Sequence, residues 1–141
     1  MKMPRLISWS FAEGRLFDLW MVVHFMTGLT GGLSNTHLLL STAPLVLVGA
    51  ALMILWEVLE WFAGIRESFE NRVIDVLVGL AGIATALQIA RLVSAEGERL
   101  AFRIALGATA ALSAAGWAAY RRRRRRTPTP GRKDARVRPE P

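Results

Sequence analysis

The chain of 141 residues contains no cysteine, which excludes disulfide bonds, thiolate metal sites and cysteine nucleophiles. Long stretches also lack charged residues, so the apolar residues gather in four blocks, at about 16–35, 38–62, 73–94 and 101–120. Each block is near or above the roughly 20 residues with which a helix crosses about 30 Å of hydrocarbon. A soluble core does not concentrate its apolar residues in this way. The sequence therefore predicts an all-α integral membrane four-helix bundle.

The net charge of +7 is unevenly distributed. Residues 121–141 hold ten basic and two acidic residues, a net charge of +8, so the first 120 residues carry −1. The same segment has four prolines and no apolar periodicity, so we expect a transmembrane domain over 1–120 and a disordered tail over 121–141. The run from Arg121 to Arg126 is expected to bind anionic headgroups of membrane lipids. A nucleic-acid partner is not expected, because the tail has no aromatic residue to stack on bases.

Basic residues also predict the orientation. Arg66 and Arg72 lie between the second and third blocks, and the arginine run follows the fourth, whereas the turn at 34–37 has no Lys or Arg. Because cytoplasmic loops are enriched in Lys and Arg, both termini are expected in the cytoplasm.

Acidic residues and one histidine interrupt the apolar blocks. Ionisable groups in membrane segments are costly and commonly functional. If the first helix begins near Leu16, Asp18 lies in its first turn and His24 lies about 12 Å from its start, near the middle of the membrane. On the second helix Glu57 and Glu60 are three residues apart and share a face, and the third helix has an acid in its first turn. We therefore expect a pocket on the cytoplasmic side that contains Glu57, Glu60, Arg66 and Asp75, with Asp18 or His24 added by the first helix.

Three interpretations of these residues stay open from the sequence. In the first, the acids are interfacial groups bonded to Asn71, Arg72, Arg66 or water, and the imidazole bonds a carbonyl. In the second, a divalent cation or a phosphate binds, with Glu57, Glu60, Asp75 and His24 as candidate metal ligands. Carboxylates more than about 8 Å apart would exclude a shared cation, given ligand distances of about 2.0–2.6 Å. In the third, neighbouring acids and the histidine transfer protons. No residue is assigned a catalytic role.

The residues Glu57, Arg66, Asp75 and Gly82 resemble the signature of VanZ-like membrane proteins, over about 30 residues. In that pattern an acid near the inner end of one helix is followed by a loop arginine, an Asp that opens the next helix, and glycines. The pair Trp56 and Glu57 is also similar to the Trp-Glu pairs of YjdF-type inner-membrane proteins. The resemblance implies the bacterial inner membrane and the cell envelope, with Arg66 as an anion-binding residue and Glu57 and Asp75 as its orienting or metal-binding partners.

We therefore expect a multi-pass inner-membrane protein whose cytoplasmic-side pocket binds or processes a phosphorylated or lipid-linked envelope component, with a divalent cation as the candidate cofactor. One alternative is a non-catalytic subunit of a homo-oligomer or membrane complex. The other is a component of proton-coupled transport.

Overall fold

The computed structural model describes residues 10–11, 18–62, 65 and 68–126, which form five helices. They are α1 (Leu19–Leu33), α2 (Asn35–Leu38), α3 (Thr42–Phe62), α4 (Phe69–Leu92) and α5 (Ala95–Arg126). The four longer helices coincide with the four apolar blocks, so the all-α prediction is confirmed. The short α2 lies in the segment predicted as a turn.

Three of the helices have the length and composition of membrane spans. The candidate spans in α3, α4 and α5 cover 21, 24 and 29 residues, and each contains an 18-residue window with a mean hydropathy of 2.0, 2.0 and 1.3, respectively. Their outer faces expose large hydrophobic side chains, such as Leu47 at 69% and Ile104 at 64%, a surface that suits hydrocarbon rather than water. With 15 residues, or about 22 Å, α1 is shorter than the hydrocarbon layer. The described part of the chain thus contains three full-length candidate spans, where the sequence predicted four.

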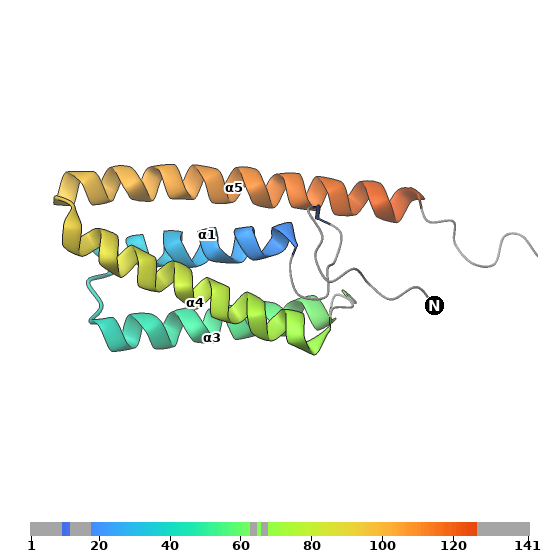
Figure 1. Ribbon diagram of the computed structural model, residues 1–141, viewed down its shortest axis with the longest axis horizontal. Helices are drawn as coiled ribbons and strands as arrows, with labels where there is room; N and C mark the ends of the chain where they lie inside the picture. The colour runs from blue at the N-terminus through green and yellow to red at the C-terminus, as the bar shows by residue number, and fades with distance from the viewer. Residues whose placement is uncertain (1–9, 12–17, 63–64, 66–67, 127–141) are drawn as a thin grey trace, which may run out of the picture.

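The shorter helix α1 lies between the others (Figure 1). It packs mainly against α4 and α5, whereas α3 packs mainly against α4. At one end of the bundle α1 and α4 begin and α3 and α5 end (Figure 1); we call this the N-terminal end of the bundle. The start of α1 and the end of α5 therefore lie on the same side, as the predicted topology requires. Which side of a membrane this end faces stays a prediction.

Glycines bring α1 and α4 into close contact. A Cβ atom added to Gly28 would collide with the backbone of Gly79, and one added to Gly82 would collide with the backbone of Phe25 and Leu29. Small residues allow this approach in a membrane, where lipid supplies no hydrophobic drive between helices. Small residues of α1 and α4 therefore form this contact. Gly107 on α5 forms no such contact among the described residues, because no atom lies within 4 Å of where its Cβ would be.

Helix α3 touches the bundle along a narrow line of residues spaced by four. Leu45, Met53 and Glu57 are buried on this line. Between them, Gly49 lies against the Ile83 side chain, and the Met53 sulfur would be 2.8 Å from a Cβ at Gly79. Only 17% of the most hydrophobic window of α3 is buried. The other faces of α3 are open to the surroundings.

Helix α5 is joined to α1 by polar and aromatic contacts. The hydroxyls of Thr30 and Thr109 are 2.9 Å apart, and Thr109 also donates to the Met26 carbonyl at 3.1 Å. Nearer the N-terminal end of the bundle, the rings of Trp20 and Trp117 meet edge to face at 6.4 Å. These contacts hold α5 on the side of α1 away from α3.

The arginine run does not begin a disordered segment. Helix α5 continues through Arg126, so the residues from Arg121 to Arg126 are helical, contrary to the predicted boundary at 120. A helix that is already formed propagates at one hydrogen bond per added residue, and arginine is a good helix former. Residues 127–141, predicted as the rest of the tail, lie outside the described residues.

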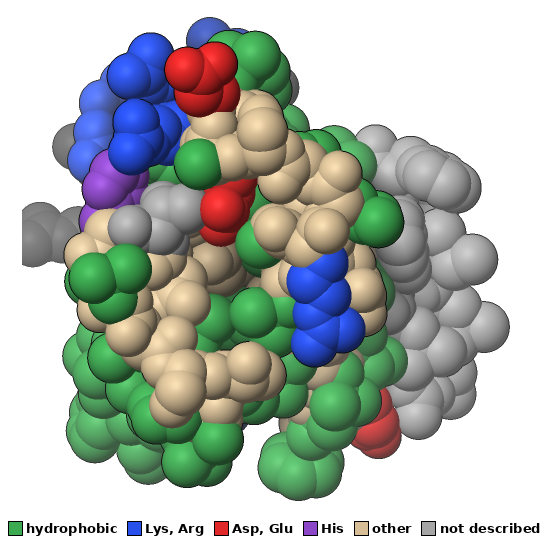
Figure 2. Space-filling model, turned by 90° about the vertical axis from the view of Figure 1, so that its left-hand side faces the viewer, with side chains coloured by type: hydrophobic (Ala, Val, Ile, Leu, Met, Phe, Trp, Pro, Cys, Tyr) green, Lys and Arg blue, Asp and Glu red, His purple; other side chains and the backbone are tan. Residues whose placement is uncertain are grey.

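The opposite end of the bundle is shown in Figure 2, where basic and acidic side chains lie beside hydrophobic ones. Charged residues here include Arg91 in the last turn of α4 and Glu96 and Glu98 in the first turn of α5. The segment between α2 and α3 is held in a tight turn, because the Asn35 side chain forms two hydrogen bonds of 2.9 Å with the backbone of Leu40. Ionisable residues thus occur at both ends of the bundle.

Candidate functional site

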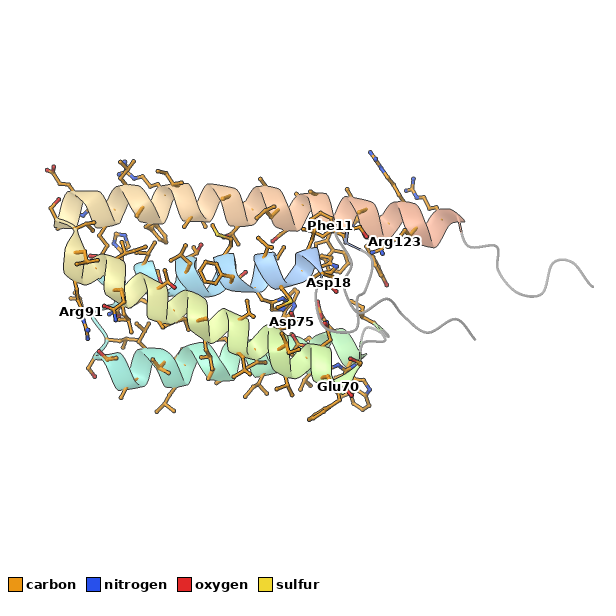
Figure 3. The ribbon with its side chains drawn as sticks, in the orientation of Figure 1. Phe11, Asp18, Glu70, Asp75, Arg91 and Arg123 are labelled. Atoms are coloured by element: carbon orange, nitrogen blue, oxygen red, sulfur yellow. The ribbon has the colours of Figure 1, made fainter. Side chains whose placement is uncertain are left out.

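Three buried ionisable residues from three helices meet inside the bundle. His24 is the sixth residue of α1, Glu57 is the sixth residue from the end of α3, and Asp75 is the seventh residue of α4. All three helices have these termini at the N-terminal end of the bundle. At 1.5 Å per residue, each side chain therefore lies about 7.5–9 Å along its helix from that end. Figure 3 shows Asp75 near this end and Arg91 far from it.

The three side chains, which we call the polar centre, lie within coordination range of one another. His24 Nε2 is 3.3 Å from Glu57 Oε1, and His24 Nδ1 is 3.8 Å from Asp75 Oδ1. One ligand atom from each residue can be chosen so that all three lie within 4.8 Å of one another. The exposed fractions are 6% for His24, 7% for Glu57 and 0% for Asp75. The polar centre therefore passes the 8 Å criterion and is shielded from the surroundings.

A backbone carbonyl orients the imidazole of His24. Its Nδ1 lies 2.9 Å from the carbonyl oxygen of Trp20, one turn earlier on α1. A carbonyl oxygen only accepts, so Nδ1 carries a proton and Nε2 faces Glu57. Metal-binding histidines commonly donate their second ring N–H in this manner, which fixes the tautomer and the ring orientation. The predicted bond from the imidazole to a carbonyl therefore exists, and it leaves Nε2 directed into the polar centre.

Asp75 is held by a neighbour on its own helix. The side-chain amide of Asn71 donates to Asp75 Oδ2 at 3.0 Å, and both residues are fully buried. Asn71 is in turn fixed at the start of α4, where its backbone N–H donates to the Ser68 hydroxyl at 3.2 Å. The predicted contact between Asn71 and Asp75 is therefore present. It positions one carboxylate oxygen while Oδ1 lies toward the imidazole.

Glu57 and His24 have buried polar atoms with no hydrogen-bond partner among the described residues. These atoms are His24 Nε2 and both carboxylate oxygens of Glu57. Nε2 and Oε1 are near each other but do not meet hydrogen-bond geometry. A buried group left without a partner costs about 1–3 kcal/mol, and more when charged. The polar centre therefore has unused bonding capacity on two different helices.

The other predicted site residues lie elsewhere. Glu60 is half-buried, and its carboxylate accepts from the Trp56 indole N–H at 2.9 Å, outside the polar centre. Asp18 is fully buried at the start of α1, where it accepts from the backbone N–H of Trp20 at 2.8 Å as the N-cap. Neither residue belongs to the group of possible metal ligands. Arg66 lies outside the described residues.

Two grooves flank α3, and each contains one residue of the polar centre. The groove between α3 and α4 has a volume of about 410 Å³ and is lined by Glu57, Arg72 and hydrophobic residues. The groove between α1, α3 and α5 has a volume of about 420 Å³ and includes His24. Sequence reasoning named Arg72 as a possible bonding partner of the acids but did not include it in the pocket, although its spacing of three from Asp75 on a helix was a usable signal.

Comparison with protein-family models, curated proteins and solved structures found no match to this chain. The resemblance to VanZ-like proteins therefore stays a prediction from the sequence.

Proposed function

We propose that this chain is a multi-pass protein of the bacterial inner membrane whose polar centre, formed by His24, Glu57 and Asp75, binds a divalent cation. Through this cation the protein would bind or process a phosphorylated component of the cell envelope on the cytoplasmic side. The proposal rests on the convergence of three buried ligand atoms within 4.8 Å. Two of these residues, His24 and Glu57, have buried polar atoms with no hydrogen-bond partner in the described part of the chain.

The charges of the polar centre support a divalent cation. An imidazole that binds a metal is neutral, and two carboxylate ligands beside it would then leave the polar centre with two negative charges at nearly full burial. Each ion removed from water costs several kcal/mol unless a counter-charge compensates it. A divalent cation cancels both charges and accepts the free electron pairs of His24 Nε2 and Glu57. It therefore satisfies the unused bonding capacity and the charge together.

The distances and donor types indicate the kind of ion. Two ligand atoms that are each about 2.0–2.2 Å from one ion lie at most about 4.4 Å apart. The ligand atoms of the polar centre lie within 4.8 Å of one another, so a movement of roughly 0.4 Å brings them to this distance. Imidazole together with carboxylate oxygens favours first-row ions such as Zn²⁺ or Mn²⁺ over Ca²⁺, which prefers oxygen alone. Three protein ligands leave at least one position for an oxygen of a phosphate.

Cobalt titration tests this proposal. The full chain, purified in dodecyl maltoside and treated with a chelator, should bind one equivalent of Co²⁺ with a visible absorption band, and millimolar inorganic phosphate should alter that band. Glu57→Gln and Asp75→Asn should lose the band, whereas Glu60→Gln should retain it because its carboxylate lies outside the polar centre. Absence of stoichiometric binding in the parent chain, or unchanged binding in both polar-centre variants, would refute the proposal.

Proton transfer is the second candidate, supported by the 3.3 Å approach of His24 Nε2 to Glu57. It predicts no stoichiometric cation and a loss of proton flux in reconstituted vesicles when Glu57 is replaced by Gln. The cobalt titration therefore separates the two candidates before any transport is measured.

A further inference from the structure

We infer that the groove between α3 and α4 binds the phosphate-bearing end of a membrane lipid, with Arg72 as the residue that positions the phosphate beside the polar centre. This inference rests on the proposed cation site and names the substrate class that reaches it. Lipid-borne phosphate is distinguished here from free phosphate in water.

The groove combines hydrophobic walls with charged residues, as a binding site for an amphiphile requires. Its walls are aliphatic or aromatic side chains, among them Ile54, Val58 and Val73, and among the described residues its charged lining residues are Glu57 and Arg72. A volume of about 410 Å³ lies in the range of small-ligand pockets, about 300–1,000 Å³. An acyl chain fits the apolar walls, and a charged headgroup fits the two charged residues.

The groove opens sideways rather than toward water. Side chains along it are exposed on the outer surfaces of α3 and α4, including Ile54 at 54%, Val58 at 41% and Leu77 at 58%. These helices have the hydropathy of membrane spans, so this surface meets lipid. A molecule that enters from the bilayer reaches Glu57 without leaving hydrocarbon. A free anion from water would first have to lose its hydration beside these apolar walls.

Arg72 adds a permanent positive charge beside the polar centre. It lies in the first turns of α4, three residues before Asp75, so the two side chains leave neighbouring parts of the same helix surface. Among the described residues, no carboxylate oxygen lies within 4.0 Å of its guanidinium nitrogens. Guanidinium binds phosphate oxygens in a bidentate geometry. With a cation on Glu57, the groove then has two positive groups for one phosphate.

Arg72 also lies at a suitable depth for a headgroup. Helix α4 begins at Phe69, so the Cα atom of Arg72 is about 4.5 Å along the helix from the N-terminal end of the bundle. Trp61 and Phe69, both lining the groove, are 59% and 78% exposed at the same end. Tryptophan is enriched at the level of the headgroups, which places Trp61 there. The phosphate would bind near this level, and the acyl chain would extend along α3 toward the membrane interior.

The test compares probes on the Co²⁺-loaded full chain in dodecyl maltoside. Dioctanoyl phosphatidate should alter the Co²⁺ band at a concentration at least ten-fold lower than inorganic phosphate or glycerol phosphate, which lack acyl chains. Dioctanoylglycerol, which lacks the phosphate, should not alter it. If inorganic phosphate is as effective as phosphatidate, the source of the phosphate is the aqueous phase and the inference is overturned.

Variants locate the binding. Arg72→Gln should weaken phosphatidate binding by about ten- to a hundred-fold while Co²⁺ affinity stays unchanged, whereas Arg91→Gln, at the far end of α4, should have no effect. Val58→Trp fills the groove and should also weaken phosphatidate binding, with Leu47→Trp as the exposed control on α3. Normal Co²⁺ binding in each variant shows that it has folded. Bound Co²⁺ with an unaltered phosphatidate response in Arg72→Gln overturns only this inference, whereas missing Co²⁺ binding in the parent chain overturns the proposed function.

Discussion

Replacing Glu57 with glutamine should change the stability of the protein in opposite directions with and without a cation. In a chelator, the parent chain keeps a carboxylate that is 7% exposed, and its two oxygens have no hydrogen-bond partner among the described residues. Glutamine keeps the shape and removes the charge. Because a buried charge without full compensation is destabilising, Glu57→Gln should leave the free energy of unfolding unchanged or raise it by about 1 kcal/mol.

With the cation present, the order of stabilities should reverse. A ligand at 100 times its dissociation constant stabilises the folded state by about 2.7 kcal/mol, provided that it does not bind the unfolded chain. The parent chain should gain this amount in Zn²⁺. Glu57→Gln, which has lost one of three ligands, should gain little. The parent chain is then about 2 kcal/mol more stable than the variant, by the same linkage.

Thermal unfolding in dodecyl maltoside, followed by far-UV circular dichroism with chelator or Zn²⁺, measures both differences. Glu60→Gln is the matched control, because it lies three residues away on α3 and glutamine can still accept from the Trp56 indole N–H. This control should resemble the parent chain in both conditions. If Glu57→Gln were less stable than the parent chain in chelator and gained as much from Zn²⁺, Glu57 would be a structural residue and the charge argument would be wrong.

Three other predictions follow from particular contacts. Asn71→Ala removes the amide that holds the neighbouring carboxylate and should weaken cation binding about 10- to 100-fold in the Co²⁺ titration, as is typical for residues that orient metal ligands; an unchanged affinity would show that this contact does not tune the polar centre. Gly28→Ala should destabilise the protein by about 1–3 kcal/mol in thermal unfolding, because its Cβ would collide with the α4 backbone, whereas Gly107→Ala has open space and should be neutral. A reporter fused after Pro141 should be found in the cytoplasm, and one inserted near Asn35 should be found outside it. An exported C-terminal reporter would contradict the orientation deduced from the basic residues.

The four apolar blocks were sufficient to predict the four long helices, because the length of an apolar run is read directly from the sequence. Their ends were less predictable. Asp18 caps α1 instead of lying in its first turn, so the helix begins at Leu19 rather than near Leu16. His24 is consequently about 7.5 Å along α1 from its start, instead of the roughly 12 Å expected from a start near Leu16. The shift brings His24 to the depth of Glu57 and Asp75, which sequence reasoning had placed nearer the surface.

Sequence reasoning grouped Glu57 with Glu60, and the structure separates them. Residues three apart on a helix are about 60° apart around its axis, since 3.6 residues complete a turn. A helix that is buried along a broad face would bury both residues. Helix α3, however, contacts the bundle only along the line through Leu45, Met53 and Glu57. Glu60 therefore leaves that line and bonds Trp56. The width of a helix contact depends on the neighbouring helices, which a single segment of sequence does not reveal.

The contact line of α3 has a mechanical consequence. Among the described residues, Glu57 is the last buried residue before α3 ends at Phe62, and Trp61 and Phe62 are 59% and 75% exposed. At the N-terminal end of the bundle, the polar centre is thus the last buried contact of α3 with the other helices. If the proposed cation binds, its bonds to α1 and α4 would restrain the terminal turn of α3, and its release would remove that restraint while the glycine-packed pair α1 and α4 stays in place. Occupancy of the proposed site would therefore control the freedom of the last turn of α3, which carries Trp61 and Phe62.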